Sequence, residues 1–284
     1  MWRQWVRAVR TWAHQGKGAW EPPRIGLALG GGFARCLAHV GIIQVLEENQ
    51  IPLHAIAGIS SGAVVAAAYA SGTPLDVVLS EGAATSFSRF AKWTLSRMGL
   101  ASNERMNTYL QKILRSTRFE DMRIPLAVVA TDLVTGSAVA FRGRGDIIAP
   151  VRASCAYPGM FLPVEIDGRW LVDGAIAANV PVAALLDMGC TRVVAVSLQT
   201  VNGEKEPPGN VFQVVSRCFA IMQERLVAEW REQAHLVLEP DVSGFAWDDY
   251  GRGNELVLTG RKTALSALPA LQAWLGSTGP ARAA

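Results

Sequence analysis

The stretch AIAGISSGAVVAAAYA, residues 55–70, places two adjacent serines inside an otherwise apolar run. Buried hydroxyls need hydrogen-bond partners, so a core strand or helix gains nothing from a pair of them. The apolar residues before Gly58 are typical of a buried strand, and the small residues after Ser61 are typical of a buried helix. The glycines that flank the serines therefore mark a tight turn from a strand into a helix.

The rest of the chain repeats this alternation of strands and helices. Strands are expected at residues 24–29, 54–59, 126–130, 138–141, 163–172 (as a hairpin turning at Asp167-Gly168), 192–197 and 235–238. Helices are expected at 34–50, 61–71, after Pro74, 146–154, 181–188, up to about 231 and 255–275, with residues 91–118 mixed and mainly helical. Such alternation implies a mainly parallel sheet with helices on both faces. We therefore expect one three-layer α/β domain over residues 24–275, preceded by an arm (1–23) and followed by a tail (276–284).

The composition fits a large globular domain. Of 284 residues, 50% are hydrophobic and 18% are charged, which argues against disorder. The net charge of +3 gives no reason to expect nucleic acid as a partner. Cys36, Cys155, Cys190 and Cys218 form no CxxC pair and no zinc spacing. We expect reduced thiols, no metal, no cofactor and a reducing compartment.

The first 20 residues have an amphipathic, basic pattern. At helical spacing, one face carries Trp2, Trp5, Val6, Val9, Trp12 and Ala13, and the other carries Arg3, Arg7, Arg10 and His14. Such a helix suits a lipid interface, with indoles at headgroup depth and arginines near anionic lipid. An arm packed on the domain and an organelle-targeting peptide have the same pattern. The expectation is a cytoplasmic protein whose arm is able to lie at the inner membrane face.

The turn at Gly58-Ile59-Ser60-Ser61-Gly62 has the G-x-S-x-G pattern of a nucleophile elbow. In such a turn the glycines remove Cβ atoms that would collide with neighbouring backbone. The strained serine then projects its hydroxyl beside the positive end of the following helix. Ser60 is the candidate nucleophile, and Ser61 is expected to cap the helix. The alternative is an ordinary strand-to-helix turn with small residues for packing.

A glycine run, Gly30-Gly31-Gly32, follows the preceding strand and comes before a helix. In a parallel sheet this position lies at the same carboxyl edge as Ser60. Backbone N–H groups there can face a carbonyl oxygen, so the three glycines are the candidate oxyanion hole. The alternative is a dinucleotide-binding loop, but Arg35 stands where the last glycine of G-x-G-x-x-G belongs.

An acid also ends a predicted strand. Asp173 follows Trp170-Leu171-Val172 and comes before Gly174 and Ala175. An acid held on such a glycine turn can be fixed against the Ser60 hydroxyl. The alternative is a turn aspartate that binds its own backbone, which is very common.

These segments together resemble the patatin-like phospholipase family, in its bacterial, neuropathy-target-esterase-like branch. The resemblance rests on LALGGGFARCLAHVGIIQVLEE, GISSG and DGA (Asp173, Gly174, Ala175), and it extends to ATDLVTG, RASCAYPGMFLPV and NVP. It covers roughly residues 24–275. It implies a Ser60–Asp173 dyad without histidine, an oxyanion site near Gly31 and Gly32, and a lipid acyl ester as substrate. Arg35 also matches the family, where it would pin the loop.

The chain departs from the family pattern at two loop positions. Phe33 and Cys36 replace glycines, so the oxyanion site is expected to be narrower or to have different backbone angles. Two other functions stay open. One is an α/β-hydrolase triad of Ser60, Asp173 and His235, and the other is a catalytically decayed member that binds lipid or protein.

Overall fold

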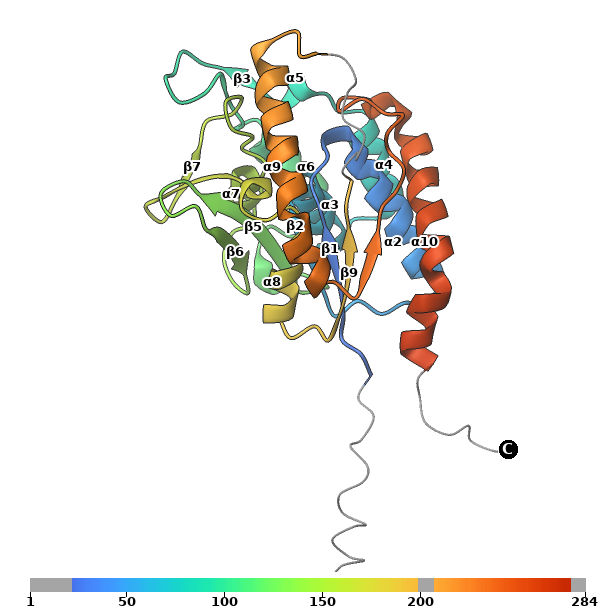
Figure 1. Ribbon diagram of the computed structural model, residues 1–284. Coiled ribbons are helices and arrows are strands. Elements are labelled where there is room, and N and C mark those ends of the chain that lie inside the picture. The colour runs from blue at the N-terminus through green and yellow to red at the C-terminus, as the bar shows by residue number, and fades with distance from the viewer. Residues whose placement is uncertain (1–21, 199–206, 277–284) are drawn as a thin grey trace, which may run out of the picture.

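A computed structural model describes residues 22–198 and 207–276 of the chain. Residues 1–21 of the predicted arm (1–23) lie outside the described residues. In the described part, an eight-stranded sheet forms the centre of the molecule (Figure 1). Its order is β10 (Leu236–Leu238), β9 (Arg192–Val196), β1 (Ile25–Leu29), β2 (Ala55–Ile59), β5 (Leu126–Asp132), β8 (Arg169–Asp173) and β7 (Val164–Ile166), with β6 (Ala138–Arg142) also paired to β5. The run from β10 to β5 is parallel, and β6, β7 and β8 join antiparallel.

The central strands are apolar throughout because both of their faces are covered. In β1, Ile25, Leu27 and Leu29 pack with the larger core cluster, whereas Ala28 packs with a second, alanine-rich cluster. This alternation follows from the two-residue period of a strand. Small residues on the second face let its helices approach the sheet closely. A Cβ at Gly26 would lie 2.8 Å from the Cys190 sulfur.

The face with large side chains is covered mainly by α2 (Leu37–Glu48), α3 (Ser61–Ala70), α4 (Leu75–Ala83) and α10 (Gly253–Gly276). Helices α2 and α10 meet backbone to backbone. A Cβ added at Gly41 would lie 2.0 Å from the Val257 carbonyl oxygen, and one at Gly260 would lie 1.9 Å from that of Ala38. The close packing of these two helices therefore requires glycine at both positions.

The opposite face is covered by α8 (Val182–Asp187) and by α9 (Val211–Gln233), which stand in front of the sheet in Figure 1. Helix α9 is attached near its carboxyl end, where Trp230 is buried with the alanine-rich cluster. Most other α9 residues whose exposure is described are half-buried or exposed. The structure thus holds α9 to the sheet at one end.

The predicted α/β fold, with a mainly parallel sheet between two helix layers, is confirmed. The predicted hairpin turn at Asp167-Gly168 has φ of 50° and 74°, as a two-residue turn of this kind requires. The expectation for residues 91–118 was only partly correct. Short antiparallel strands β3 (Lys92–Trp93) and β4 (Ala101–Ser102) follow the single-turn helix α5 (Phe87–Phe90) and precede α6 (Met106–Ile113).

The β3–β4 hairpin depends on a distant segment. The Leu100 and Ala101 N–H groups both donate to the Met160 carbonyl, and the Leu162 N–H donates back to Ala101. The local sequence does not indicate that residues 160–162 would pair with this hairpin. The prediction of a mainly helical segment at 91–118 relied on spacing alone and was therefore only partly correct. Among the described residues, no helix combines the length and apolarity needed to cross a membrane.

Candidate functional site

Ser60 lies between β2 and α3, at the carboxyl edge of the sheet. Its φ of 54° and ψ of −131° are a strained combination for a residue with a side chain. Both flanking glycines are required by the backbone. A Cβ at Gly58 would lie 2.5 Å from the Ala63 Cα, and one at Gly62 would lie 2.4 Å from the Gly30 carbonyl oxygen. The turn is therefore packed directly against the glycine run.

A second serine holds the turn in place. The fully buried Ser154, at the end of α7 (Ile148–Ser154), accepts a hydrogen bond from the Ser60 N–H at 2.8 Å. Its hydroxyl donates to the Val129 carbonyl at 2.6 Å. Sequence analysis missed Ser154 as a site residue. The motif RASCAYPGM contains it, but no spacing rule connects it to residue 60.

Asp173 ends β8, which pairs with β5 so that Asp173 lies opposite Ala130. Its backbone is fixed on both sides: its N–H donates to the Ala156 carbonyl at 3.0 Å, and its carbonyl accepts from the Thr131 hydroxyl at 2.9 Å. The following Gly174 is required here, because a Cβ there would lie 2.2 Å from the Val129 carbonyl oxygen. The aspartate of the DGA motif is thus held rigidly at the sheet edge.

The Asp173 carboxyl is 2% exposed, and burial raises its pKa to about 6. A hydrogen bond from the Ala175 N–H, at 3.0 Å, and the nearby Ser60 hydroxyl keep the pKa from rising further. Ser60 and Asp173, the two residues of the predicted dyad, line the same cavity. The same carboxylate also raises the pKa values of the neighbouring Cys155 and Tyr157, after burial as the main cause.

The three glycines of the run have different environments. The Gly30 N–H donates to the Val196 carbonyl at 3.0 Å and continues the β1–β9 ladder, so this N–H is not available to a substrate. The Gly32 N–H donates to the Ser61 hydroxyl at 3.1 Å. Gly31 lies beside the candidate nucleophile, since a Cβ there would be 3.0 Å from the Ser60 Cβ and 3.6 Å from its Oγ.

Phe33 adopts a φ of 51°, the left-handed region that favours glycine. Whether this loop differs from one with glycine at position 33 stays a prediction. The ring forms an aromatic wall. Its centroid lies 5.4 Å from that of Tyr157 and 5.3 Å from that of Trp247.

The loop is held from outside by residues 245–247. The Arg35 guanidinium donates to the Phe245 carbonyl through Nε and Nη2, at 2.9 and 2.7 Å, and the Ala34 N–H donates to the Trp247 carbonyl at 2.9 Å. Arg35 thus pins the loop, as the family resemblance implied.

Ser61 does not cap α3, contrary to expectation. Its hydroxyl accepts from the Gly32 N–H, so it ties the elbow to the glycine run. Burial raises the pKa of Cys36 to about 12 and that of Cys155 well above its usual value. Both thiols face the site in neutral form, which makes them poor nucleophiles at neutral pH. All four cysteines are free, although Cys218 is exposed rather than in apolar surroundings.

An apolar cavity of about 90 Å³ opens beside the Ser60 and Asp173 side chains. Since about 10–15 Å³ of this kind of space holds one water, the cavity has room for a chain of several heavy atoms. Its walls come from the elbow, α4, α5, α6 and the 155–161 segment. They include Phe33, Val64, Val78, Phe90, Met106, Tyr109, Tyr157 and Phe161.

No described histidine reaches this cavity. His235 precedes β10 at the amino end of the parallel strands, where its Nδ1 accepts from the Val193 N–H at 3.2 Å. His39 is fully buried and donates through Nε2 to the Gly30 carbonyl at 2.9 Å, and burial lowers its pKa to about 4. The alternative triad with His235 is therefore wrong, because His235 and Ser60 lie at opposite edges of the sheet. Within the described ranges, no group of three or more His, Cys, Asp and Glu side chains could hold a metal ion.

The fold and this edge define an α/β protein with a strained serine, a buried acid and a glycine loop meeting at one cavity. The family profile described as patatin-like phospholipase matches residues 27–186, more than half of the chain. The chain belongs to the patatin-like phospholipase family.

Relatives extend the comparison to neuropathy-target-esterase-like proteins. An uncharacterized NTE family protein of Mycobacterium tuberculosis is 37% identical over 201 residues, which are 66% of this chain and 51% of that protein. The lysophospholipase NTE1 of Mycosarcoma maydis is 33% identical over 186 residues, 63% of this chain and 10% of that protein. The chain thus spans about half or less of the length of these relatives.

Solved structures resemble the chain in fold. Human GIVD cytosolic phospholipase A2, bound to methyl gamma-linolenyl fluorophosphonate, has a TM-score of 0.51 at 13% identity and covers 94% of this chain and 62% of its own. VipD from Legionella pneumophila has a TM-score of 0.50 at 14% identity and covers 88% of this chain and 67% of its own.

Proposed function

We propose that the protein is a serine hydrolase of lipid acyl esters that works with a Ser60–Asp173 dyad. The observation that carries the proposal is that Ser60 and Asp173 line the same cavity, where burial raises the pKa of the Asp173 carboxyl to about 6. A base with a pKa near the working pH combines a useful ionised fraction with proton affinity. The strained backbone at Ser60 and the neutral state of nearby thiols agree with this assignment.

In the proposed first half-reaction, the Ser60 Oγ attacks the ester carbonyl carbon and Asp173 accepts the hydroxyl proton. The Gly31 N–H would stabilise the oxyanion, joined by that of Gly32 once it gives up the Ser61 hydroxyl. The intermediate collapses as the alcohol leaves with the proton from Asp173, and an acyl-serine remains. Water then attacks the acyl carbon, gives a proton to Asp173 and releases the carboxylic acid, while the proton returns to Ser60.

A lipid acyl chain suits the cavity. Its lining is mainly apolar and includes the two polar reacting groups. Burial of apolar chain carbons stabilises a complex by roughly 25 cal/mol per Å² of surface. Similarity to a lysophospholipase, together with the fold shared with a phospholipase A2, supports a phospholipid or lysophospholipid as the ester.

The test is labelling by an alkyl fluorophosphonate, followed by hydrolysis of a phospholipid and lysophospholipid panel. Wild type should be labelled and active, and Ser60→Ala should be neither. Ser61→Ala is the matched control, because it removes the neighbouring hydroxyl while the nucleophile stays, and it should still be labelled.

A properly folded wild-type protein that takes no label would contradict the proposal. That result would favour the remaining alternative, a decayed member of the family that binds lipid or protein.

A further inference from the structure

Two exposed apolar segments contact residues of the cavity wall. In the hairpin segment, residues 92–102, Trp93, Leu95, Met98 and Leu100 are 69%, 107%, 52% and 57% exposed. On α9, Val211, Val214, Ile221 and Met222 are 79%, 46%, 51% and 49% exposed. Soluble proteins usually keep such side chains scattered, so a gathering of them indicates a binding surface.

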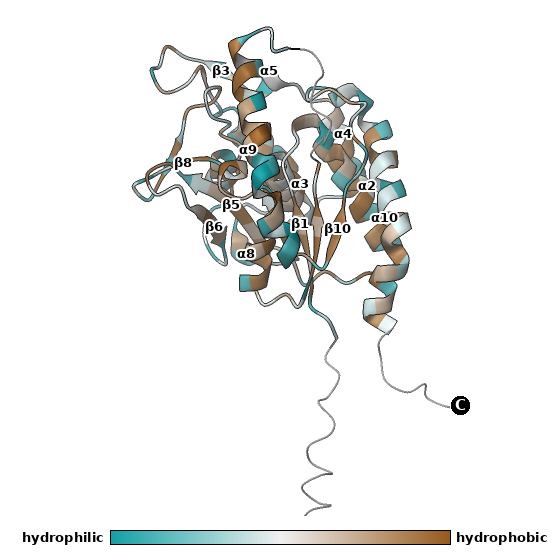
Figure 2. Cartoon of the chain, in the orientation of Figure 1, coloured by the Kyte–Doolittle hydropathy of each residue, from teal (hydrophilic) through white to brown (hydrophobic). Residues whose placement is uncertain are grey.

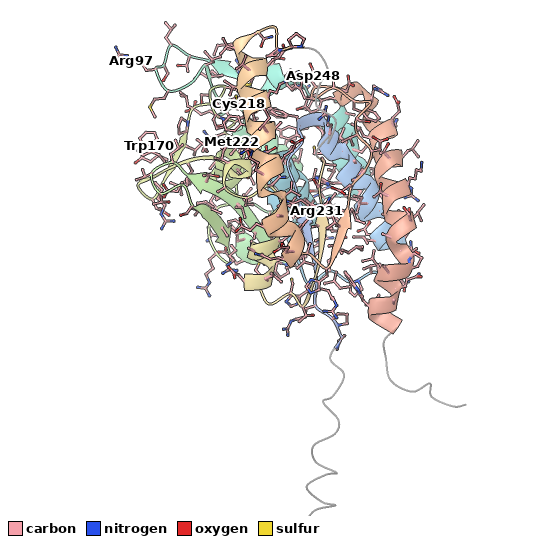
Figure 3. All side chains as sticks on the ribbon, in the orientation of Figure 1. Arg97, Trp170, Cys218, Met222, Arg231 and Asp248 are labelled. Atoms are coloured by element: carbon pink, nitrogen blue, oxygen red, sulfur yellow. The ribbon has the colours of Figure 1, made fainter. Side chains whose placement is uncertain are left out.

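The α9 side chains form one stripe. Residues 211, 214, 218, 221 and 222 follow each other at steps of three, four, three and one, which is helical spacing for a single face. Figure 2 shows hydrophobic residues along the N-terminal half of this helix, and Figure 3 labels Cys218 and Met222 on it. The other side of α9 faces the site, since the Phe219 ring lies 5.4 Å from Tyr157 and the Gln223 amide donates to the Ala175 carbonyl at 3.4 Å.

The two segments meet on a common support, the turn from Tyr157 to Phe161, in which the Phe161 N–H donates to the Tyr157 carbonyl at 2.9 Å. Tyr157 contacts α9, and Phe161 forms a bridge to Ala101 in the hairpin segment. Both aromatic residues line the cavity. Each segment therefore contacts one residue of the cavity wall.

Charge favours an anionic partner. The hairpin segment carries Lys92 and Arg97 and no acid, although Lys92 pairs with Glu104 at 3.7 Å, and α9 carries Arg217 and no acid before Glu224. Arg97 is exposed at the tip of the hairpin (Figure 3). Exposed apolar side chains interspersed with cations fit a bilayer surface, where the apolar groups enter the acyl boundary and the cations meet phosphates.

We propose that the hairpin segment and the α9 stripe form a docking face for an anionic lipid bilayer, which delivers acyl chains to the cavity beside Ser60. Delivery of acyl chains to Ser60 rests on the proposed function, whereas docking on the bilayer does not. Residues 1–20 are a separate candidate for lipid contact and are unchanged in every variant below.

The experiment is sedimentation of the full chain with vesicles of phosphatidylcholine and phosphatidylglycerol in equal amounts. Trp93→Ser/Leu95→Ser and Ile221→Ser/Met222→Ser should each weaken vesicle affinity about tenfold or more, because each removes large apolar side chains from the lipid. Arg97→Gln should weaken affinity about fivefold on these vesicles and leave it unchanged on phosphatidylcholine alone. Leu258→Ser/Leu265→Ser, which removes two leucines that are 65% and 49% exposed on α10, is the matched control and should bind as wild type.

Unchanged affinity in both face variants, with melting temperatures equal to that of wild type, would overturn the proposal. A second outcome would also overturn it: the wild type self-associates, and the face variants abolish this self-association without changing vesicle affinity. The partner of the face would then be a second copy of the chain. Hydrolysis of soluble p-nitrophenyl butyrate separates docking from chemistry. The face variants should keep it, and a wild type that docks through this face but hydrolyses no ester would refute the proposed function alone.

Discussion

At the scale of single residues, catalysis and burial have opposite effects on the ionisation of Asp173. To accept a proton the carboxyl must be ionised, whereas burial favours its protonated form. No arginine or lysine is among the groups that shift its pKa. Ionisation is supported only by the Ala175 N–H and the Ser60 hydroxyl, so activity and stability should respond to pH in opposite directions.

Hydrolysis should therefore increase with pH through about 6, the pKa of Asp173 in the folded protein. Below this pH, each unit should lower kcat/KM about tenfold, because only the ionised carboxylate accepts the Ser60 proton. A soluble ester measured across the acid and neutral range reports this ionisation in the free enzyme. An acid limb centred near the ordinary aspartate pKa, about 4, would contradict the dyad as described.

Replacing Asp173 by asparagine should stabilise the fold above pH 6 while it abolishes hydrolysis. The folded-state pKa lies above the unfolded value, so the folded state binds the proton more tightly, and this stability is present at low pH and lost as pH rises from about 4 to about 6. Asparagine keeps the acceptor for Ala175 without the buried charge. We expect a gain of about 2 kcal/mol at pH 8 that vanishes near pH 4, measured by urea unfolding. A less stable variant at pH 8 would refute this.

At Phe33, strain and packing act in opposite directions. Phe33→Gly should relieve about 1 kcal/mol of left-handed backbone strain and lose two aromatic contacts worth about 0.5–1.5 kcal/mol each. Phe33→Ala loses the same contacts and keeps the strain, because its φ would still be near 51°. The glycine variant should therefore be the more stable of the two by about 1 kcal/mol in denaturant unfolding. Equal stabilities would show that the loop relaxes to another conformation.

At the scale of elements, the glycines between α2 and α10 matter more than either helix's own propensity. Gly41 and Gly260 bring the helix backbones into contact, and each carbonyl they face belongs to the other helix. Helix α10 lies outside the residues 27–186 that match the family profile, yet it packs on α2 and β10 and completes this helix layer.

Gly260→Ala should therefore destabilise the protein by about 3 kcal/mol or more, since its Cβ would lie 1.9 Å from the Ala38 carbonyl oxygen. Gly251→Ala is the control, because nothing lies within 4 Å of a Cβ there. That change should be neutral or mildly stabilising. Thermal unfolding of both variants tests this prediction. Similar melting temperatures would show that the helices shift apart with little loss of stability.

At the scale of the whole molecule, the sheet separates His235 from the reactive groups. His235 pairs across to Val193 at the amino ends of the strands, whereas Ser60 and Asp173 lie at the opposite edge. His235→Ala should leave hydrolysis within about twofold of wild type, and any effect should appear in stability through its contact with Trp274. Loss of most activity at unchanged melting temperature would contradict the dyad.

Sequence predicted what local pattern encodes. The turn at Ser60 carries its strand, its two glycines and its helix within 16 residues, so its position at the sheet edge followed directly. Contacts between distant segments left no such signal. The hairpin segment takes its conformation from Met160, Ser154 reaches Ser60 across 94 residues, and the Gly30 N–H is engaged by Val196. Each of these depends on which segments the fold brings together.

The position of β1 has a consequence for synthesis of the protein. Strand β1 pairs with β2, which is synthesised soon afterwards, and with β9, which begins only at residue 192. The face of α2 that contains Gly41 stays uncovered until α10 has been synthesised. A growing chain released up to about residue 190 exposes an unpaired apolar strand edge and an uncovered helix face, both of which invite aggregation. The nascent chain should therefore depend on chaperone protection until α10 leaves the ribosome.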